Sequence, residues 1–374
     1  MDFALTDEQT MLRDGATRYL DDNYIFEQRR AVLALPTSCS EAHWAAFAEM
    51  GWLALPLPES AGGLGGSLVD IALLMEAMGR KLVLEPYATT ALLAARILEK
   101  STAAQSRSIW LPQIAEGRLR IALADAESGD CAASRPTVTR AVVHGAGWRV
   151  TGTKVLAYDA PAAQQLIVVA RIEPRDELAL LLLPANAPGV KMQDYPLIDG
   201  TRAADIEFSD VSVDANALLL RGPEVAVALD EAADRLVLAR VAESLGMMDT
   251  VMQLTAEHLR NRVQFGQPLA KFQSLQHRMS EMFVEVQETR SILYRGIANI
   301  DADAATRRAA VSAAKIVATQ AARIVGGQGI QLHGGIGMTD EYAVGHYFKR
   351  LIAIEKSFGD LDTHLERLAT SIRN

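Results

Sequence analysis

The chain has 374 residues, of which 49% are hydrophobic and 22% are charged, and its formal net charge is −9. This length exceeds one hydrophobic core of ordinary size, so two or three domains are expected. The acidic balance and the lack of any Lys or Arg run argue against nucleic acid as a partner. The chain has neither a basic export leader nor an apolar run of about 18–20 residues, which predicts a cytoplasmic protein without a membrane span.

The two cysteines, Cys39 and Cys131, lie far apart, and neither belongs to a CxxC pair or to a cluster with histidine. Cysteine is too scarce for a disulfide scaffold. The pattern predicts reduced thiols, as in a cytoplasmic protein, and no metal site.

The first segment, residues 1–118, has a helical pattern. It opens with Thr6 and Gln9, whose spacing is that of a capping box at a helix N-terminus. Residues 70–78 keep apolar side chains at three- and four-residue intervals, as an amphipathic helix does. A glycine-rich turn at residues 59–66 precedes this run. These signals predict an N-terminal helical domain.

The hydrophobic period changes near Arg118, and residues 119–222 contain short strand-like runs separated by turn residues. Such closely spaced strands predict a small barrel or sandwich. From residue 223 to 374 the helical period returns, and Ala304–Val325 is dense in alanine, which suits closely packed helices. The chain order is therefore helical, β, helical, an α+β multidomain fold.

Two motifs stand out in the C-terminal segment. The first interrupts two long helical patterns with a turn: Arg262 is followed by Phe265 and Gly266 and, eleven residues after the arginine, by Gln273. The second is the run Gln-Leu-His-Gly-Gly-Ile-Gly at residues 331–337. Either motif alone is typical of an ordinary surface turn or helix end. Their pairing within this three-segment chain favours a shared binding function.

Both motifs resemble elements of the acyl-CoA dehydrogenase family, and the resemblance covers essentially the whole chain. Residues 3–9 resemble the family's opening helix, residues 51–66 its Pro-Glu-x-x-Gly-Gly stretch, and Gly152-Thr153-Lys154 its Gly-x-Lys element. The resemblance implies an N-terminal helical domain (1–118), a middle β-barrel (119–222) and a C-terminal four-helix bundle (223–374). The bundle would make most of the interface of an oligomer.

The resemblance also implies an FAD clamp. In it, Arg262 binds the pyrophosphate, Phe265 packs near the flavin, and Gln273 bonds the adenosine portion. Arginine suits this role as a forked, permanently charged donor. In the second motif, which contributes Gln331, Gly334 and Gly335, the glycines let backbone N–H groups approach an anion. The clamp reaches across a subunit interface in the family, which implies a homo- or hetero-oligomer, either a dimer or a tetramer.

Flavin contacts from the middle domain depart from the family pattern. Residues 124–130 only loosely resemble the family's Thr-Glu-x-x-x-Gly-Ser-Asp loop. Where the family has Trp-Ile-Thr beside the flavin, this chain has Leu156, Ala157 and Tyr158. The C-terminal motifs are therefore the stronger prediction.

The catalytic base is not identified by the sequence. Family members take this carboxylate from a Tyr-Glu-Gly-Thr element, whose glutamate position falls on Phe358, or from an earlier helix, where the position falls on Leu236. Asp234 lies two residues before that position and so about 200° around a helix, and it fits a charge at a helix N-terminus. Glu243 is on the matching face but about 10 Å farther along, and it fits a salt bridge to Arg240.

Two other acidic residues near the first position, Glu355 and Asp360, are expected to be solvated or structural. In lacking this base, the chain resembles the smaller subunits of two-component acyl-CoA dehydrogenases, such as those acting on pimeloyl-CoA or steroid side-chain CoA thioesters. In such an assembly the partner carries the base.

The leading hypothesis is thus an FAD-dependent subunit that oxidises an acyl-CoA to the 2,3-enoyl form and passes electrons to an electron-transfer flavoprotein. The alternatives are a homomeric enzyme with a relocated base, a non-catalytic FAD- or CoA-binding partner subunit, and a flavin-dependent oxygenase. Linear order does not reveal pocket depth, so the acyl group stays open.

Overall fold

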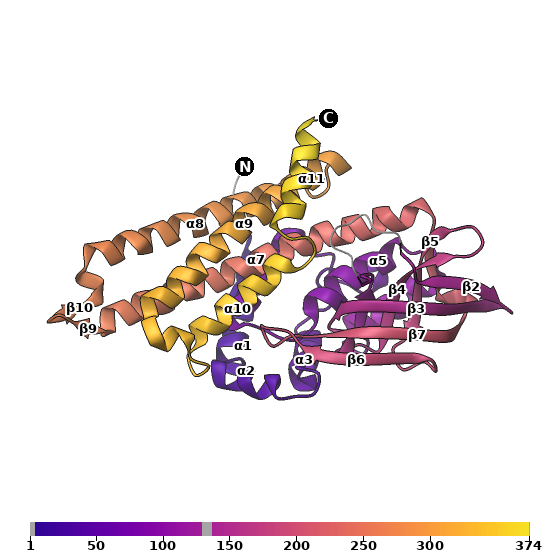
Figure 1. Ribbon diagram of the computed structural model, residues 1–374, viewed down its shortest axis with the longest axis horizontal. Helices are drawn as coiled ribbons and strands as arrows, with labels where there is room; N and C mark the ends of the chain where they lie inside the picture. The colour runs from indigo at the N-terminus through magenta and orange to yellow at the C-terminus, as the bar shows by residue number, and fades with distance from the viewer. Residues whose placement is uncertain (1–3, 129–136, 374) are drawn as a thin grey trace. The chain divides into compact units, whose positions relative to one another are not determined.

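A computed structural model describes residues 4–128 and 137–373 (Figure 1). The chain forms two compact units, each built from segments that are discontinuous in sequence. The helical unit comprises Met1–Arg30, Leu68–Val83 and Val237–Asn374, and the mixed unit comprises Ala31–Ser67 and Leu84–Leu236. Helix α7 (Pro223–Asn261) runs from one unit into the other.

Long helices make up the helical unit. They are α1 (Asp7–Asn23), α4 (Leu68–Lys81), the second part of α7, α8 (Gln273–Ala298), α9 (Ala304–His333), α10 (Ala343–Lys356) and α11 (Leu361–Arg373), and α2 (Phe26–Leu33) begins there. The predicted capping box of α1 is confirmed: the backbone N–H of Gln9 donates to Thr6 Oγ1 over 3.2 Å, and that of Thr6 donates to Gln9 Oε1 over 3.1 Å. Alanines of α9 line its buried face, as their density in the sequence indicates.

Helices α4 and α7 pack at backbone contact through a reciprocal pair of glycines. A Cβ added to Gly79 would overlap the carbonyl of Glu243, and a Cβ added to Gly246 would overlap the carbonyl of Glu76. No side chain fits at either position. The two helices can therefore approach only because each places a glycine against the other's backbone.

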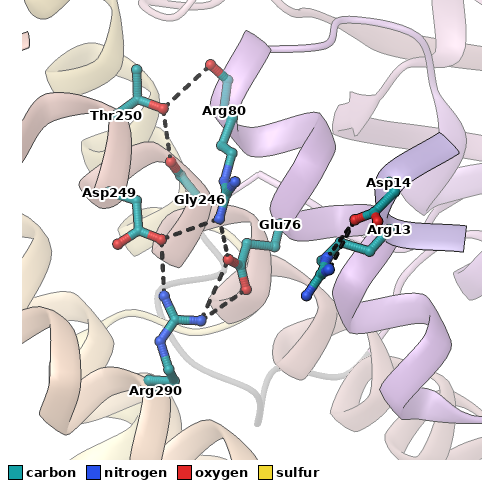
Figure 2. Close-up of polar contacts among 8 residues, drawn as sticks. All are labelled: Arg13, Asp14, Glu76, Arg80, Gly246, Asp249, Thr250 and Arg290. Carbon is teal, nitrogen blue, oxygen red and sulfur yellow. Dashed lines mark hydrogen bonds and ion pairs between the residues drawn. The ribbon is translucent and has the colours of Figure 1, made fainter. Parts of the chain in front are cut away.

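An ion-pair network surrounds this crossing (Figure 2). Arg290 of α8 lies 3.1 Å from Glu76 and 2.9 Å from Asp249, and Arg80 lies 2.7 Å from Glu76. The charges of two guanidinium groups and two carboxylates, from three helices, thus neutralise one another. The hydroxyl of Thr250 bonds the carbonyls of Gly246 and Arg80 (Figure 2).

Among its described residues, the mixed unit is built on a sheet of eight strands. Its hydrogen-bonded order is β6-β7-β3-β2-β4-β5-β8, and β1 pairs with β4. The strands are β1 (Ile121–Ala124), β2 (Arg140–His144), β3 (Gly147–Tyr158), β4 (Gln165–Ile172), β5 (Glu177–Pro184), β6 (Val190–Pro196), β7 (Arg202–Asp214) and β8 (Leu218–Arg221). Short helices accompany the sheet: α3 (Glu41–Glu49), α5 (Ala95–Lys100) and α6 (Leu111–Ala115).

Apolar runs explain the centre of this sheet. Leu166, Val168 and Ala170 of β4 and Leu181 and Leu183 of β5 are fully buried in one core cluster. Antiparallel pairing of β4 with β5 places these runs side by side.

The predicted fold class, with N-terminal helices, a central sheet and a C-terminal helical domain, is confirmed. Strand β8 ends at Arg221 and α7 begins at Pro223, close to the predicted change at 222. The boundaries of the three domains stay a prediction, because compactness divides the chain into two units along other lines.

Candidate functional site

The motif that begins at Arg262 forms a hairpin between α7 and α8. Strands β9 (Val263–Gln264) and β10 (Gln267–Pro268) pair across a two-residue turn, and the N–H of Leu269 donates to the carbonyl of Arg262 over 2.8 Å. Figure 1 shows this hairpin where α7 ends and α8 begins. The turn that interrupts the helical pattern is therefore a defined structure rather than a loose loop.

The tip of the hairpin, Phe265 and Gly266, has positive φ angles of 52° and 78°. Such angles suit a two-residue hairpin turn but are uncommon for a bulky residue. Phe265 is also 91% exposed, and its ring meets that of Phe272 edge-on at 6.1 Å. A strained, solvent-exposed aromatic contributes little to folding, so the position points to a binding role.

The other predicted residues of this motif are exposed as well. Gln273 is the first residue of α8, and its side chain is accessible. Arg262 is exposed, and its guanidinium makes no hydrogen bond or ion pair with any residue of the described ranges 4–128 and 137–373. This arginine is available to an anionic ligand.

The second motif lies at the C-terminus of α9. Gln331, Gly334 and Gly335 are exposed, and a Cβ added to either glycine would meet no atom within 4 Å. Gly334 has a φ of 63°, and its N–H donates to the carbonyls of Gln331 and Ile330 as the cap of the helix. An anion would therefore find open space at both glycines, although the N–H of Gly334 is already used.

The structure brings the two motifs together through residues that the sequence analysis did not single out. The ring of His258, in the last turn of α7, lies 4.6 Å from the ring of His333, at the end of α9. The ring of His333 in turn accepts a 3.2 Å hydrogen bond from the hydroxyl of Tyr342, while its other nitrogen bonds the carbonyl of Gly329. Burial, the neighbouring His333 and Arg262 lower the pKa of His258. Of these residues, only His333 belongs to one of the two motifs, the run at residues 331–337.

The two middle-domain motifs also meet. Lys154 is fully buried and donates to Glu127 Oε1 over 2.7 Å and to the carbonyl of Asp125 over 3.0 Å. Burial would raise the pKa of Glu127, but bonds from Lys154, Val138 and Thr139 outweigh it and lower the pKa to about 2. Gly129, Asp130 and Cys131 lie outside the described residues, and Cys39 is a buried free thiol.

Where the family has Trp-Ile-Thr beside the flavin, the first two positions of this chain carry neither an aromatic ring nor a hydroxyl group. Leu156 is 38% exposed, with a φ of 53° and its N–H donated to Asp205, and Ala157 is buried. The ring of Tyr158, at the third position, is partly exposed at the end of β3.

Neither of the two positions predicted for the base carries a carboxylate. Leu236 is fully buried within α7, and Phe358 stands in the turn between α10 and α11 with a φ of 53°. Asp234 is buried as well. Because α7 begins at Pro223, Asp234 lies well inside the helix, and the expectation that it is a charge at a helix N-terminus is wrong.

Glu243 is held by two arginines. Arg240 lies 2.5 Å from one carboxylate oxygen, as the sequence predicted, and Arg350 of α10 lies 2.8 Å from the other. Burial would raise the pKa of Glu243, but the charges of Arg240 and Arg350 outweigh it and lower the pKa. A carboxylate so stabilised is a poor proton acceptor.

The remaining acidic candidates are structural too, as expected. Glu355 pairs with Arg323 at 2.5 Å, and this hydrogen-bonded arginine lowers the pKa of Glu355. Asp360 accepts hydrogen bonds from the backbone N–H of Thr363 at 3.1 Å and from its hydroxyl at 2.8 Å, which lowers the pKa of Asp360. These contacts make Asp360 the cap of α11.

The residues of the two C-terminal motifs fit a flavin dinucleotide. An unpaired guanidinium, an exposed aromatic ring, two accessible glutamines and two glycines open to solvent gather at one end of the helical unit. These groups match a diphosphate, a ring system and a polar nucleoside. Within the described residues no cluster of three or more His, Cys, Asp or Glu could hold a metal ion. The helices of the described ranges include none with both the length and the apolar character to cross a membrane.

Comparison with known proteins gives consistent matches. Residues 6–118 match the family Acyl-CoA dehydrogenase, N-terminal domain, and residues 230–372 match the family Acyl-CoA dehydrogenase, C-terminal domain. A curated relative, acyl-CoA dehydrogenase FadE27 of Mycobacterium tuberculosis (strain ATCC 25618 / H37Rv), is 26% identical over 84% of this chain and 82% of its own length.

Two solved structures share the fold. The ChsE4-ChsE5 complex from Mycobacterium tuberculosis matches with a TM-score of 0.90 and 26% identity, over 100% of this chain and 99% of the matched one. A glutaryl-CoA dehydrogenase from Mycobacterium smegmatis, solved in complex with FADH2, matches with a TM-score of 0.89 and 19% identity, over 98% of this chain and 95% of its own. The latter likeness is one of fold alone.

Proposed function

The chain belongs to the acyl-CoA dehydrogenase family, and we propose that it is an FAD-binding subunit of an acyl-CoA dehydrogenase whose catalytic carboxylate comes from a second subunit. The substrate would be a CoA thioester, oxidised to the 2,3-enoyl form, with an electron-transfer flavoprotein as acceptor. The observation that carries the proposal is an exposed set of residues resembling the family's flavin-binding motifs, in a chain whose acidic candidates for the base are buried or already paired.

Binding of FAD is proposed for the six residues of the two C-terminal motifs. Arg262 would pair with the pyrophosphate, Phe265 would pack on the ring system, and Gln273 would bond the adenosine portion. Gln331 and the glycines at 334 and 335 would line the same dinucleotide. All of these residues are exposed, which supports a clamp that contacts the cofactor across a subunit interface.

When bound, FAD supplies the hydride acceptor for the β-carbon of the substrate. Removal of the α-proton needs a carboxylate within hydrogen-bond reach of the α-carbon. In this chain Phe358 and Leu236 occupy the two predicted positions, and Glu243 is bound by Arg240 and Arg350. These observations disfavour a homomeric enzyme with a relocated base.

A heteromeric assembly is supported by the likeness to the ChsE4-ChsE5 complex, which consists of two different chains by its name. We propose a similar arrangement here, with the partner providing the carboxylate. The same observations also favour one alternative, a non-catalytic subunit that binds FAD or CoA and supports its partner without turnover of its own. The two roles differ in whether the flavin held by Arg262 is reduced by substrate.

The proposal is tested by visible absorbance of the purified chain. We expect a yellow protein whose flavin band is not bleached anaerobically by any of a panel of acyl-CoAs, and is bleached by at least one of them after a partner chain from the same gene cluster is added. A colourless protein that refuses added FAD, with and without the partner, would contradict the proposal. Flavin that is bound but never bleached would identify the non-catalytic role.

A further inference from the structure

A buried lysine of α9 donates hydrogen bonds to the turn Ser357–Asp360, between α10 and α11, and to the helix end before it. Lys315 is 2% exposed, and its Nζ donates to the carbonyls of Ile354, over 2.5 Å, and Ser357, over 3.0 Å. Helix ends are normally capped at little cost by a glycine or by water. A buried amine is an expensive way to satisfy two carbonyls, because its charge loses hydration.

A buried histidine holds the next residue of the same turn. His364 of α11 is fully buried, with Nε2 3.1 Å from the carbonyl oxygen of Phe358 and Nδ1 3.2 Å from the hydroxyl of Ser312. Burial lowers the pKa of His364 to about 4, so the ring is neutral near pH 7. A neutral ring donates from Nε2 to the Phe358 carbonyl and accepts at Nδ1 from Ser312, which lies one helical turn before Lys315.

The backbone of the turn leaves no freedom at its centre. Phe358 has a φ of 53° and Gly359 a φ of 95°, and a Cβ added to Gly359 would lie 2.8 Å from His364 Nε2. Only glycine fits there. On the far side, Asp360 caps α11 through Thr363. Ser357, Phe358 and Asp360 are thus each held by a hydrogen bond from α9 or α11.

We propose that Lys315 and His364 are positioning residues that fix the backbone of residue 358, so that the turn presents its side chain in one set orientation. The inference rests on the proposed function, in which residue 358 is one of the two positions predicted for the family's base. It adds that the turn holds the backbone of residue 358 in place although Phe358, and not a carboxylate, stands there.

The first test measures amide hydrogen exchange of the Ser357–Asp360 segment in the purified full-length chain and needs no activity. Lys315→Met and His364→Leu should each speed exchange in this segment at least tenfold. The controls Lys349→Met and His277→Leu replace a partly exposed lysine and an exposed histidine elsewhere in the helical unit, and they should not change exchange in the turn. Unchanged exchange in both test variants would overturn the proposal.

Conservative variants separate positioning from mere folding. Lys315→Gln and His364→Gln keep a side-chain N–H donor of similar reach and should restore most of the protection lost in the apolar variants. Their failure to do so, in chains that remain folded by circular dichroism, would show that the hydrogen bonds to the turn are not what holds it. If the apolar variants do not fold, the glutamine variants alone decide the question.

A second test uses Phe358→Glu, which places a carboxylate at the supported position. With FAD and a CoA thioester that the assembled enzyme oxidises, this variant alone should show turnover that the parent chain lacks. Adding Lys315→Met or His364→Leu should lower kcat at least tenfold with little change in KM, and an unchanged kcat would overturn the proposal. An inactive Phe358→Glu chain that binds FAD would count against a link between this turn and catalysis, and not against the proposed function, which flavin bleaching with the partner tests separately. The exchange measurement would still decide the positioning role.

Discussion

Arg262 is the residue whose predicted role is most sharply testable. Its side chain is exposed and unpaired within the described part of the chain, so replacing it removes no internal contact. A hydrogen bond to a charged group contributes about 1.5–3 kcal/mol, which corresponds to at least about tenfold in affinity. Arg262→Ala should weaken FAD binding by that factor and leave the melting temperature of the flavin-free chain unchanged.

Fluorescence titration with FAD measures this effect. Arg262→Lys should retain part of the affinity, because it keeps the charge and loses the forked geometry. Arg260→Ala is the matched control, since Arg260 is an exposed arginine two residues earlier. Equal FAD affinity of the Arg262→Ala and Arg260→Ala variants would contradict a role of Arg262 in FAD binding.

His364 predicts a pH dependence of stability. Its pKa falls from 6.5 to about 4 on folding, because burial disfavours the charged ring. Between these values the unfolded chain binds a proton that the folded chain excludes, so stability falls as the pH is lowered from 6.5 towards 4. The full loss is on the order of 3 kcal/mol.

The groups that face this histidine are Lys315 of α9, Arg367 of α11 and Asp360 of the turn, and the positive charges of Lys315 and Arg367 act in the same direction as burial. Urea unfolding at a series of pH values should show a shallower acid slope for His364→Gln than for the parent chain. His277→Gln should keep the parent slope. Parallel slopes in all three proteins would mean that His364 does not titrate as the structure indicates.

At the scale of elements, the crossing of α4 and α7 depends on two glycines. Gly79→Ala and Gly246→Ala each insert a methyl group into the opposite helix backbone, which cannot move aside as a side chain could. Overpacking of this kind costs typically 1–3 kcal/mol, and we expect values near the upper end. The free energy of unfolding, measured by urea denaturation, tests this.

Gly327→Ala is the matched control for the helix crossing. Gly327 also lies inside a long helix, α9, and an added Cβ there would meet no atom within 4 Å. Alanine favours a helix over glycine by up to about 1 kcal/mol, so this variant should be neutral or more stable than the parent. A similar loss in all three variants would show that the close approach of α4 and α7 does not set the effect.

Local patterns made part of these elements predictable. The capping box of α1 and the Glu243–Arg240 pair follow from spacings of three residues, and both are present. Contacts between distant segments could not be predicted. The pair of Arg350 and Glu243, the ring contact of His258 and His333, and the bonds of Lys315 to the turn all depend on how the helices pack. Lys315 in particular lies in an alanine-rich run, where a lysine is ordinarily expected at the surface.

The prediction for Asp234 failed for a related reason. Its pattern resembled a helix start, but α7 begins at Pro223, and the preceding residues continue the helix without a break. A charge deep in a helix has no macrodipole to favour it. That Leu236 and Phe358 occupy the family's two base positions stays a prediction, because it rests on counting residues from the motifs.

At the scale of the whole molecule, the chain is a member of the acyl-CoA dehydrogenase family, and we propose that it has kept the cofactor motifs but not the catalytic carboxylate. The hairpin at Arg262 and the glycines after α9 remain open to a ligand. Glu243, Glu355 and Asp360 are occupied by arginines or by a helix cap. Such a division is expected in an oligomer whose sites are completed by another chain.

The most direct measurement of this division is steady-state turnover of the purified, FAD-saturated chain with a dye as electron acceptor, across acyl-CoAs of different chain length. Without a partner we predict no turnover above the rate of FAD and dye alone, and turnover once the partner is added. Turnover by the chain alone would contradict the account, because it would require a base among residues that the structure shows to be apolar or already paired.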